Sequence, residues 1–135
     1  MKMIKTLRSF GSQRESKYMT NKSVIEPLAL KFANHLVKER YDSATQMISI
    51  EKQTDWNSNW IKSEYLEMIE YGEGKPNHIE VMVFDSMNEW PSKNENDLGW
   101  VYVAICGEGY NEAVALIFSE CNKETMITNI EWGRP

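Results

Sequence analysis

The residues of this chain that suit catalysis are carboxylates in strand-like segments, together with tyrosines. A carboxylate can act as a general base beside a substrate carbon, and a tyrosine hydroxyl can stabilise the oxyanion that develops. The candidates are Asp85, Glu80, Glu112, His78, Tyr65 and Tyr102. None of them belongs to a recognisable catalytic motif. Glu80 and Glu112 are also explained as solvated strand ends, and Tyr102 as a core residue, so the sequence leaves catalysis open.

The side chains that most often bind metals or act as nucleophiles lack a useful spacing. His35, His78, Cys106 and Cys121 do not show the short separations of a zinc site, and no Ser/His/Asp or Cys/His order stands out. We therefore expect no metal and no cofactor. The two cysteines fall near opposite ends of neighbouring predicted strands, which favours free thiols and a cytoplasmic location.

A second group of residues indicates binding rather than catalysis. Seven aromatic residues are predicted to line an apolar ligand pocket: Trp56, Trp60, Tyr65, Phe84, Trp100, Tyr102 and Phe118. Pockets for small molecules are lined mainly by apolar and aromatic side chains. Core packing is the alternative for Trp56 and Trp60, which are four residues apart. Trp90 stands in a long polar loop, residues 86–97, and is predicted either to contact a protein or to fold back on the domain.

Charge is unevenly distributed along the chain of 135 residues, whose net charge is −5. Residues 1–22 contain six basic side chains and one acidic one, so nine basic and nineteen acidic groups remain in the rest. An acidic body argues against nucleic acid as the main partner. No run is long and apolar enough to cross a membrane.

The first 22 residues are predicted to form a basic, loosely held tail. Met3, Ile4, Leu7 and Phe10 have helical spacing between basic side chains, so a short amphipathic anchor is the alternative. The rest, residues 23–135, is predicted to be one domain, since its length suits a single hydrophobic core.

Three strand-like runs follow one another closely in the last third of the chain. Residues 98–106, 112–121 and 125–132 are rich in β-branched and aromatic side chains, and residues 78–85 form a similar earlier run. The gaps between the last three have hairpin length, so these strands should pair antiparallel in sequence order. If Cys106 lies opposite Glu112, Trp100 lies opposite Phe118 and Tyr102 lies opposite Leu116.

Both faces of this predicted sheet are apolar in the middle, so both should be covered. A helix over residues 23–40 would cover one face, because Ser23 and Glu26 form a capping box and Pro27 suits a first turn. The other face is expected to surround a cavity or contact a second copy. Two shorter helices are expected at residues 41–48 and 58–71, which gives an α+β fold.

The order of these elements resembles the nuclear transport factor 2-like superfamily. Phe32 and Leu36 lead into the break at 41–44, and residues 126–132 resemble the last strand of that superfamily. The resemblance covers about residues 23–132. It implies a cone in which a curved antiparallel sheet wraps around a long N-terminal helix, with two shorter helices and a pocket at the open end. It also implies a homodimer through the sheet.

That superfamily includes ketosteroid isomerases, polyketide cyclases, ligand binders, transport factors and immunity proteins, so the fold alone does not assign a function. The leading hypothesis is a pocketed domain that binds a small apolar or amphipathic ligand without catalysis. One alternative is a cofactor-independent isomerase, lyase or cyclase that uses one pocket carboxylate. Another is a protein-interaction module, such as a toxin-immunity protein, which the acidic body and the Trp90 loop suggest.

Overall fold

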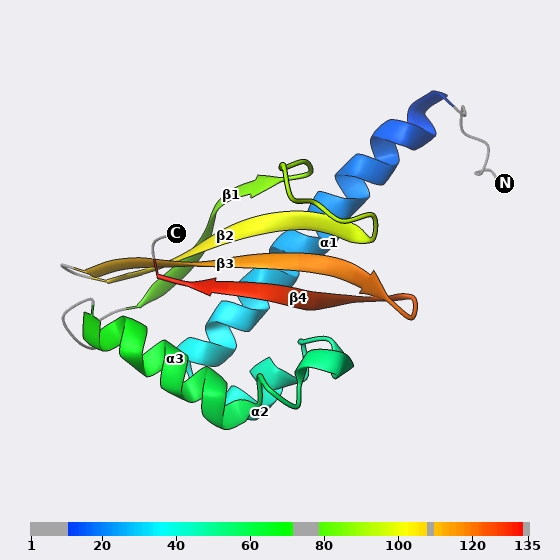
Figure 1. The fold of residues 1–135 in the computed structure, drawn as a ribbon. Helices are drawn as coiled ribbons and strands as arrows, with labels where there is room; N and C mark the ends of the chain where they lie inside the picture. Colours follow the sequence, from blue (N-terminus) through cyan, green and yellow to red (C-terminus); the bar gives the residue numbers. More distant parts are fainter. Residues whose placement is uncertain (1–10, 72–78, 108–109, 134–135) are drawn as a thin grey trace, which may run out of the picture.

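The structure is a computed structural model that describes residues 11–71, 79–107 and 110–133. Its helices precede its strands in the chain (Figure 1). The elements are α1 (Gly11–Val37), α2 (Tyr41–Thr45), a short 3-10 helix η1 (Ile50–Lys52), α3 (Ser58–Tyr71), β1 (Glu80–Met87), β2 (Asp97–Gly107), β3 (Tyr110–Cys121) and β4 (Glu124–Trp132). The predicted α+β class is confirmed.

The four strands form one curved antiparallel sheet in the order β1-β2-β3-β4. The hairpin-sized gaps correctly predict the pairing of the last three strands. The predicted register of β2 and β3 is wrong by one residue, because Tyr102 lies opposite Ala115 and Val101 opposite Leu116. The observed register places Val101 and Val103 of β2 on the same face as Leu116 and Val114 of β3. A slip of one residue would have put Leu116 on the same face as Tyr102.

Helix α1 begins before its predicted start. It extends from Gly11, so Ser23 is an interior residue rather than a cap, and Pro27 lies inside the helix. The predicted capping box is therefore wrong, since a cap requires a non-helical residue at that position. Glu39 then ends the helix with φ 59°, and Arg40 N–H donates to the His35 carbonyl at 2.7 Å, which closes the last turn. The loose attachment of residues 1–22 stays a prediction.

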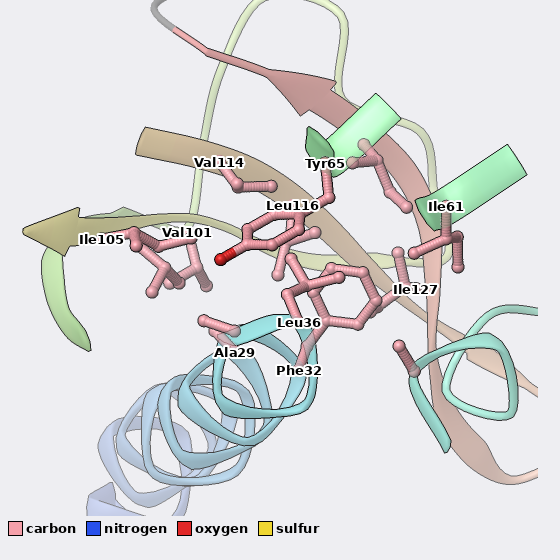
Figure 2. Close-up of a cluster of buried hydrophobic side chains, with 14 of the residues drawn as sticks. Ala29, Phe32, Leu36, Ile61, Tyr65, Val101, Ile105, Val114, Leu116 and Ile127 are labelled. Atoms are coloured by element: carbon pink, nitrogen blue, oxygen red, sulfur yellow. The ribbon is translucent and has the colours of Figure 1, made fainter. Parts of the chain in front are cut away.

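The hydrophobic core lies between α1, α3 and one face of the sheet, which we call the inner face. Figure 2 shows Phe32 and Leu36 of α1 directed toward Leu116 and Ile127 of the strands, with the Tyr65 ring of α3 between them. All five side chains are almost completely buried. The Ser86 hydroxyl also donates to the Glu26 carboxylate at 2.6 Å and ties β1 to α1. The predicted cover of one sheet face by this helix is confirmed.

The opposite face, which we call the outer face, carries no helix of the described chain. In Figure 1, α1 passes behind the sheet and no helix lies in front of it. By the observed register this face includes Trp100, Tyr102, Ala115 and Ile117. Within the described residues the loop around Trp90 reaches this face, since Trp90 contacts Trp100. The expectation that a cavity or a second copy covers the rest of this face stays a prediction.

Candidate functional site

The structure brings together two of the catalytic candidates, Asp85 and Tyr102. They are cross-strand partners in β1 and β2 and lie on the outer face. Asp85 is exposed, and its Oδ1 accepts the backbone N–H of Ser86 at 2.8 Å. Glu80, opposite Cys106 at the start of β1, is also exposed. An open face cannot exclude water from a reacting group, so this arrangement lacks the enclosure that makes electrostatic catalysis effective.

The remaining catalytic candidates lie elsewhere. Tyr65 is 1% exposed within the core, and Glu112 is 5% exposed opposite Ile105 on the inner face. The sheet separates both of them from Asp85. His78 lies outside the described residues. The described candidates therefore do not form one catalytic site.

The seven predicted pocket residues are divided between the two faces of the sheet. Tyr65 and Phe118 are buried in the core, and Trp56 and Trp60 pack against it. Phe84, Trp100 and Tyr102 belong to the outer side, because alternation from the inward-facing Val83 and the pairing of β1 with β2 place them there. One pocket cannot be lined by both groups, since the sheet lies between them.

Trp56 and Trp60 pack against other aromatic rings rather than line an open pocket. The Trp56 and Trp60 rings stack at 5.2 Å with an interplanar angle of 10°, and Trp132 meets Trp60 edge-on at 6.0 Å. The Lys52 ammonium group lies over the Trp56 ring, 4.8 Å from its centroid, in a cation–π contact. These contacts favour the core-packing alternative for Trp56 and Trp60.

An aromatic row follows β1 and β2 on the outer face. We call it the outer strip and define it as Met82, Phe84, Trp90, Trp100 and Tyr102. Trp100 lies 5.3 Å from Tyr102 and 6.1 Å from Trp90, measured between ring centroids. Trp90 therefore folds back onto the sheet, which was one of its two predicted positions. Phe84 occupies the irregularity between Val83 and Asp85 and is 75% exposed, while Met82 is 47% exposed.

The charge around the outer strip is acidic. The four strands contain no lysine or arginine, but they contain seven acids, namely Glu80, Asp85, Asp97, Glu112, Glu120, Glu124 and Glu131. Register places Glu80, Asp85 and Glu131 on the outer face. The nearby Lys93 is 5.9 Å from the Trp90 ring and forms an ion pair with Glu89 at 2.9 Å. Its charge is thus largely balanced.

A polar network that sequence reasoning missed lies where the loop after β1 meets β2. Ser119 donates to Asp97 Oδ1 at 2.5 Å, and the Asn94 N–H donates to Asp97 Oδ2 at 2.9 Å. Asp97 and Ser119 are 8% and 4% exposed. They lie beside an open cavity of about 490 Å³ that Lys52 also lines. No local motif marks this network, because its members are 22 residues apart and meet only through the sheet.

Two titratable groups of the described chain that lie outside the outer strip, His35 and Cys121, have shifted pKa values. Burial, assisted by Arg40, Lys31 and Lys38, lowers the pKa of His35 below 6.5. Burial, assisted by Glu51, raises the pKa of the Cys121 thiol. Cys106 and Cys121 are both free thiols, as their predicted positions near opposite strand ends require.

Among the residues that the structure describes, no group of three or more His, Cys, Asp or Glu side chains is arranged to hold a metal ion. None of the described helices has the length and apolar character needed to span a membrane. Comparisons of the chain with protein-family models, curated proteins and solved structures find no match.

Proposed function

We propose that this chain is a protein-recognition domain that binds a partner segment through the outer strip. The supporting observation is an aromatic row on a sheet face that no described helix covers, with Phe84 75% exposed. Contiguous exposed apolar patches on soluble proteins usually mark interaction surfaces. Tryptophan and tyrosine are also the side chains that most often dominate binding energy at protein interfaces.

The charge of the strands defines the chemistry of the partner. The acids of the outer face, Glu80, Asp85 and Glu131, have no lysine or arginine beside them in the strands. A segment with apolar side chains on one side and lysine or arginine at its margins would match both features. The apolar contacts would supply most of the affinity, and the charges at the rim would mainly speed association and select the partner.

The positions of the other candidates favour this function over ligand binding and catalysis. The predicted ligand pocket loses its aromatic lining because the sheet lies between the two groups of aromatic residues. Asp85 is exposed and Tyr102 is half-buried on a face that no described helix covers. Membership of the nuclear transport factor 2-like superfamily is part of our proposal, supported by three helices followed by four antiparallel strands. A homodimer through the sheet is one form of the proposed recognition.

A peptide panel tests the proposal. The probes are amphipathic peptides with leucine and phenylalanine on one side and lysine on the other, together with the same peptides carrying glutamate in place of lysine. We expect the basic peptides alone to bind, with an affinity that falls as salt is added. Phe84→Ala should weaken binding about 10-fold, which corresponds to about 1.4 kcal/mol.

The matched control is Leu66→Ala, because Leu66 is an exposed apolar residue, 39% accessible, on α3 rather than on the outer face. This variant should bind the basic peptides as the wild type does. The proposal is wrong if no basic peptide binds, or if Phe84→Ala and Leu66→Ala have the same effect.

A further inference from the structure

The chain itself contains a segment with the chemistry that the outer strip would select. Residues 1–10 include three basic side chains, no acidic one, and apolar residues at helical spacing. The residues concerned are Lys2, Lys5, Arg8, Met3, Ile4, Leu7 and Phe10. This segment directly precedes α1 and lies outside the described residues.

We propose that residues 1–10 of one copy bind the outer strip of a second copy. The inference rests on the proposed function, because it uses the same surface and names its occupant. The lysines and Arg8 would meet Glu80, Asp85 and Glu131, and the apolar side chains would cover Phe84 and its neighbours. Opposite charges would then lie together where the strands supply only acids.

The length of α1 limits this contact within one copy. Ile25 packs against Gly99, the residue next to Trp100, since a Cβ at Gly99 would meet Ile25 Cδ1 at 2.3 Å. Gly11 precedes Ile25 by fourteen residues of continuous helix, about 21 Å at 1.5 Å per residue. Leu7 lies at most about 14 Å of extended chain from Gly11. The backbone at Leu7 and Phe10 therefore stops short of the level of Gly99 in its own copy.

Direct contact between two outer faces is disfavoured by charge. Each face would bring Glu80, Asp85 and Glu131 to the junction without a basic strand residue to neutralise them. If each copy instead places its basic residues 1–10 on the outer face of the other copy, opposite charges meet and the contact is attractive. A reciprocal exchange uses both segments and both faces, so it closes a dimer rather than extending into a filament.

Two full-length variants separate these arrangements. The segment variant, Lys5→Glu with Arg8→Glu, reverses charge in residues 1–10, and the face variant, Phe84→Asp, alters the outer strip at an exposed position. The dissociation constant of the dimer is measured by sedimentation equilibrium. We expect the wild type to dimerise and each variant alone to dissociate at least 10-fold more readily. Leu66→Asp should dimerise as the wild type does.

An equal mixture of the two variants provides the decisive measurement. The intact segment of the face variant can bind the intact face of the segment variant, so heterodimers with one intact junction should form and should be weakened by salt. A mixture that stays monomeric overturns the proposal, as does a segment variant that dimerises like the wild type. A monomeric wild type overturns it too, including one that binds phosphatidylserine vesicles through residues 1–10. If basic peptides still bind through Phe84 in those cases, only this inference fails and the proposed function remains.

Discussion

Replacement of Gly99 by alanine tests how closely α1 approaches β2. The added Cβ would lie 2.3 Å from Ile25 Cδ1. Carbon atoms attract each other best at about 3.5–4.0 Å, so the helix or the side chain must move by about 1 Å or more. Ile25 is completely buried and has no solvent to move into. The substitution should therefore strain the core.

The magnitude follows from two opposing effects. Overpacking a core by a methyl group costs about 1–3 kcal/mol. Gly99 does not have a positive φ. Alanine therefore suits its backbone and should recover about 0.4–1 kcal/mol by restricting the unfolded chain. We expect Gly99→Ala to lower the free energy of unfolding by about 1–2 kcal/mol, as measured by urea denaturation.

Ile25→Val should relieve the strain that Gly99→Ala introduces. It removes Cδ1, and the next atom, Cγ1, lies at an ordinary contact distance of 3.7 Å from the added Cβ. Alone it should cost about 0.5–1.5 kcal/mol. The double variant should be more stable than the two single effects predict by about 1 kcal/mol, whereas Ile127→Val, at another buried position, should be additive with Gly99→Ala. Additive effects of Gly99→Ala and Ile25→Val would refute the close approach of α1 to β2.

Three further predictions concern groups away from the outer strip. Asp97→Ala should lower the free energy of unfolding by about 1–3 kcal/mol, because the Ser119 hydroxyl and the Asn94 N–H lose their acceptor. The nearby control Glu95→Ala should change it by less than about 0.5 kcal/mol. Equal effects of the two variants in urea denaturation would contradict the network. Because the pKa of His35 is lower in the folded than in the unfolded state, its contribution to stability should be complete above pH 6.5 and decline as the pH falls below it. The free energy of unfolding of His35→Gln should fall less than that of the wild type between pH 7 and pH 5, as measured by urea denaturation at each pH. An equal fall in both proteins would contradict this prediction. Burial and Glu51 raise the pKa of Cys121, so Glu51→Gln should speed its alkylation by iodoacetamide at pH 8, as followed by mass spectrometry of the Cys121 peptide; an unchanged rate would exclude the influence of Glu51.

Local sequence was sufficient for the strands and for their order. Runs rich in β-branched and aromatic residues marked them, and gaps of hairpin length required neighbouring strands to pair. Local sequence did not predict where α1 starts. The capping box at Ser23 and Glu26 is a local pattern, and the helix continues through it from Gly11. The position of Pro27 inside the helix shows the same limit.

The aromatic residues show why the site was harder to predict. Their composition indicated a binding surface, but alternation in one strand does not reveal which residues of the next strand share its face. A register shift of one residue moved Tyr102 away from Leu116 and placed it beside Ala115. This shift assigned Trp100 and Tyr102 to the outer face, away from Phe118 in the core.

The sequence by itself determined the α+β class, the antiparallel order of the strands and the acidic character of the domain, because these depend on composition and on short separations along the chain. Only the tertiary structure decided that the seven aromatic residues occupy two faces, that Asp85 adjoins Tyr102, and that Asp97 meets Ser119. The physical reason is that cross-strand register and helix position are fixed by packing between distant segments, which no single segment encodes.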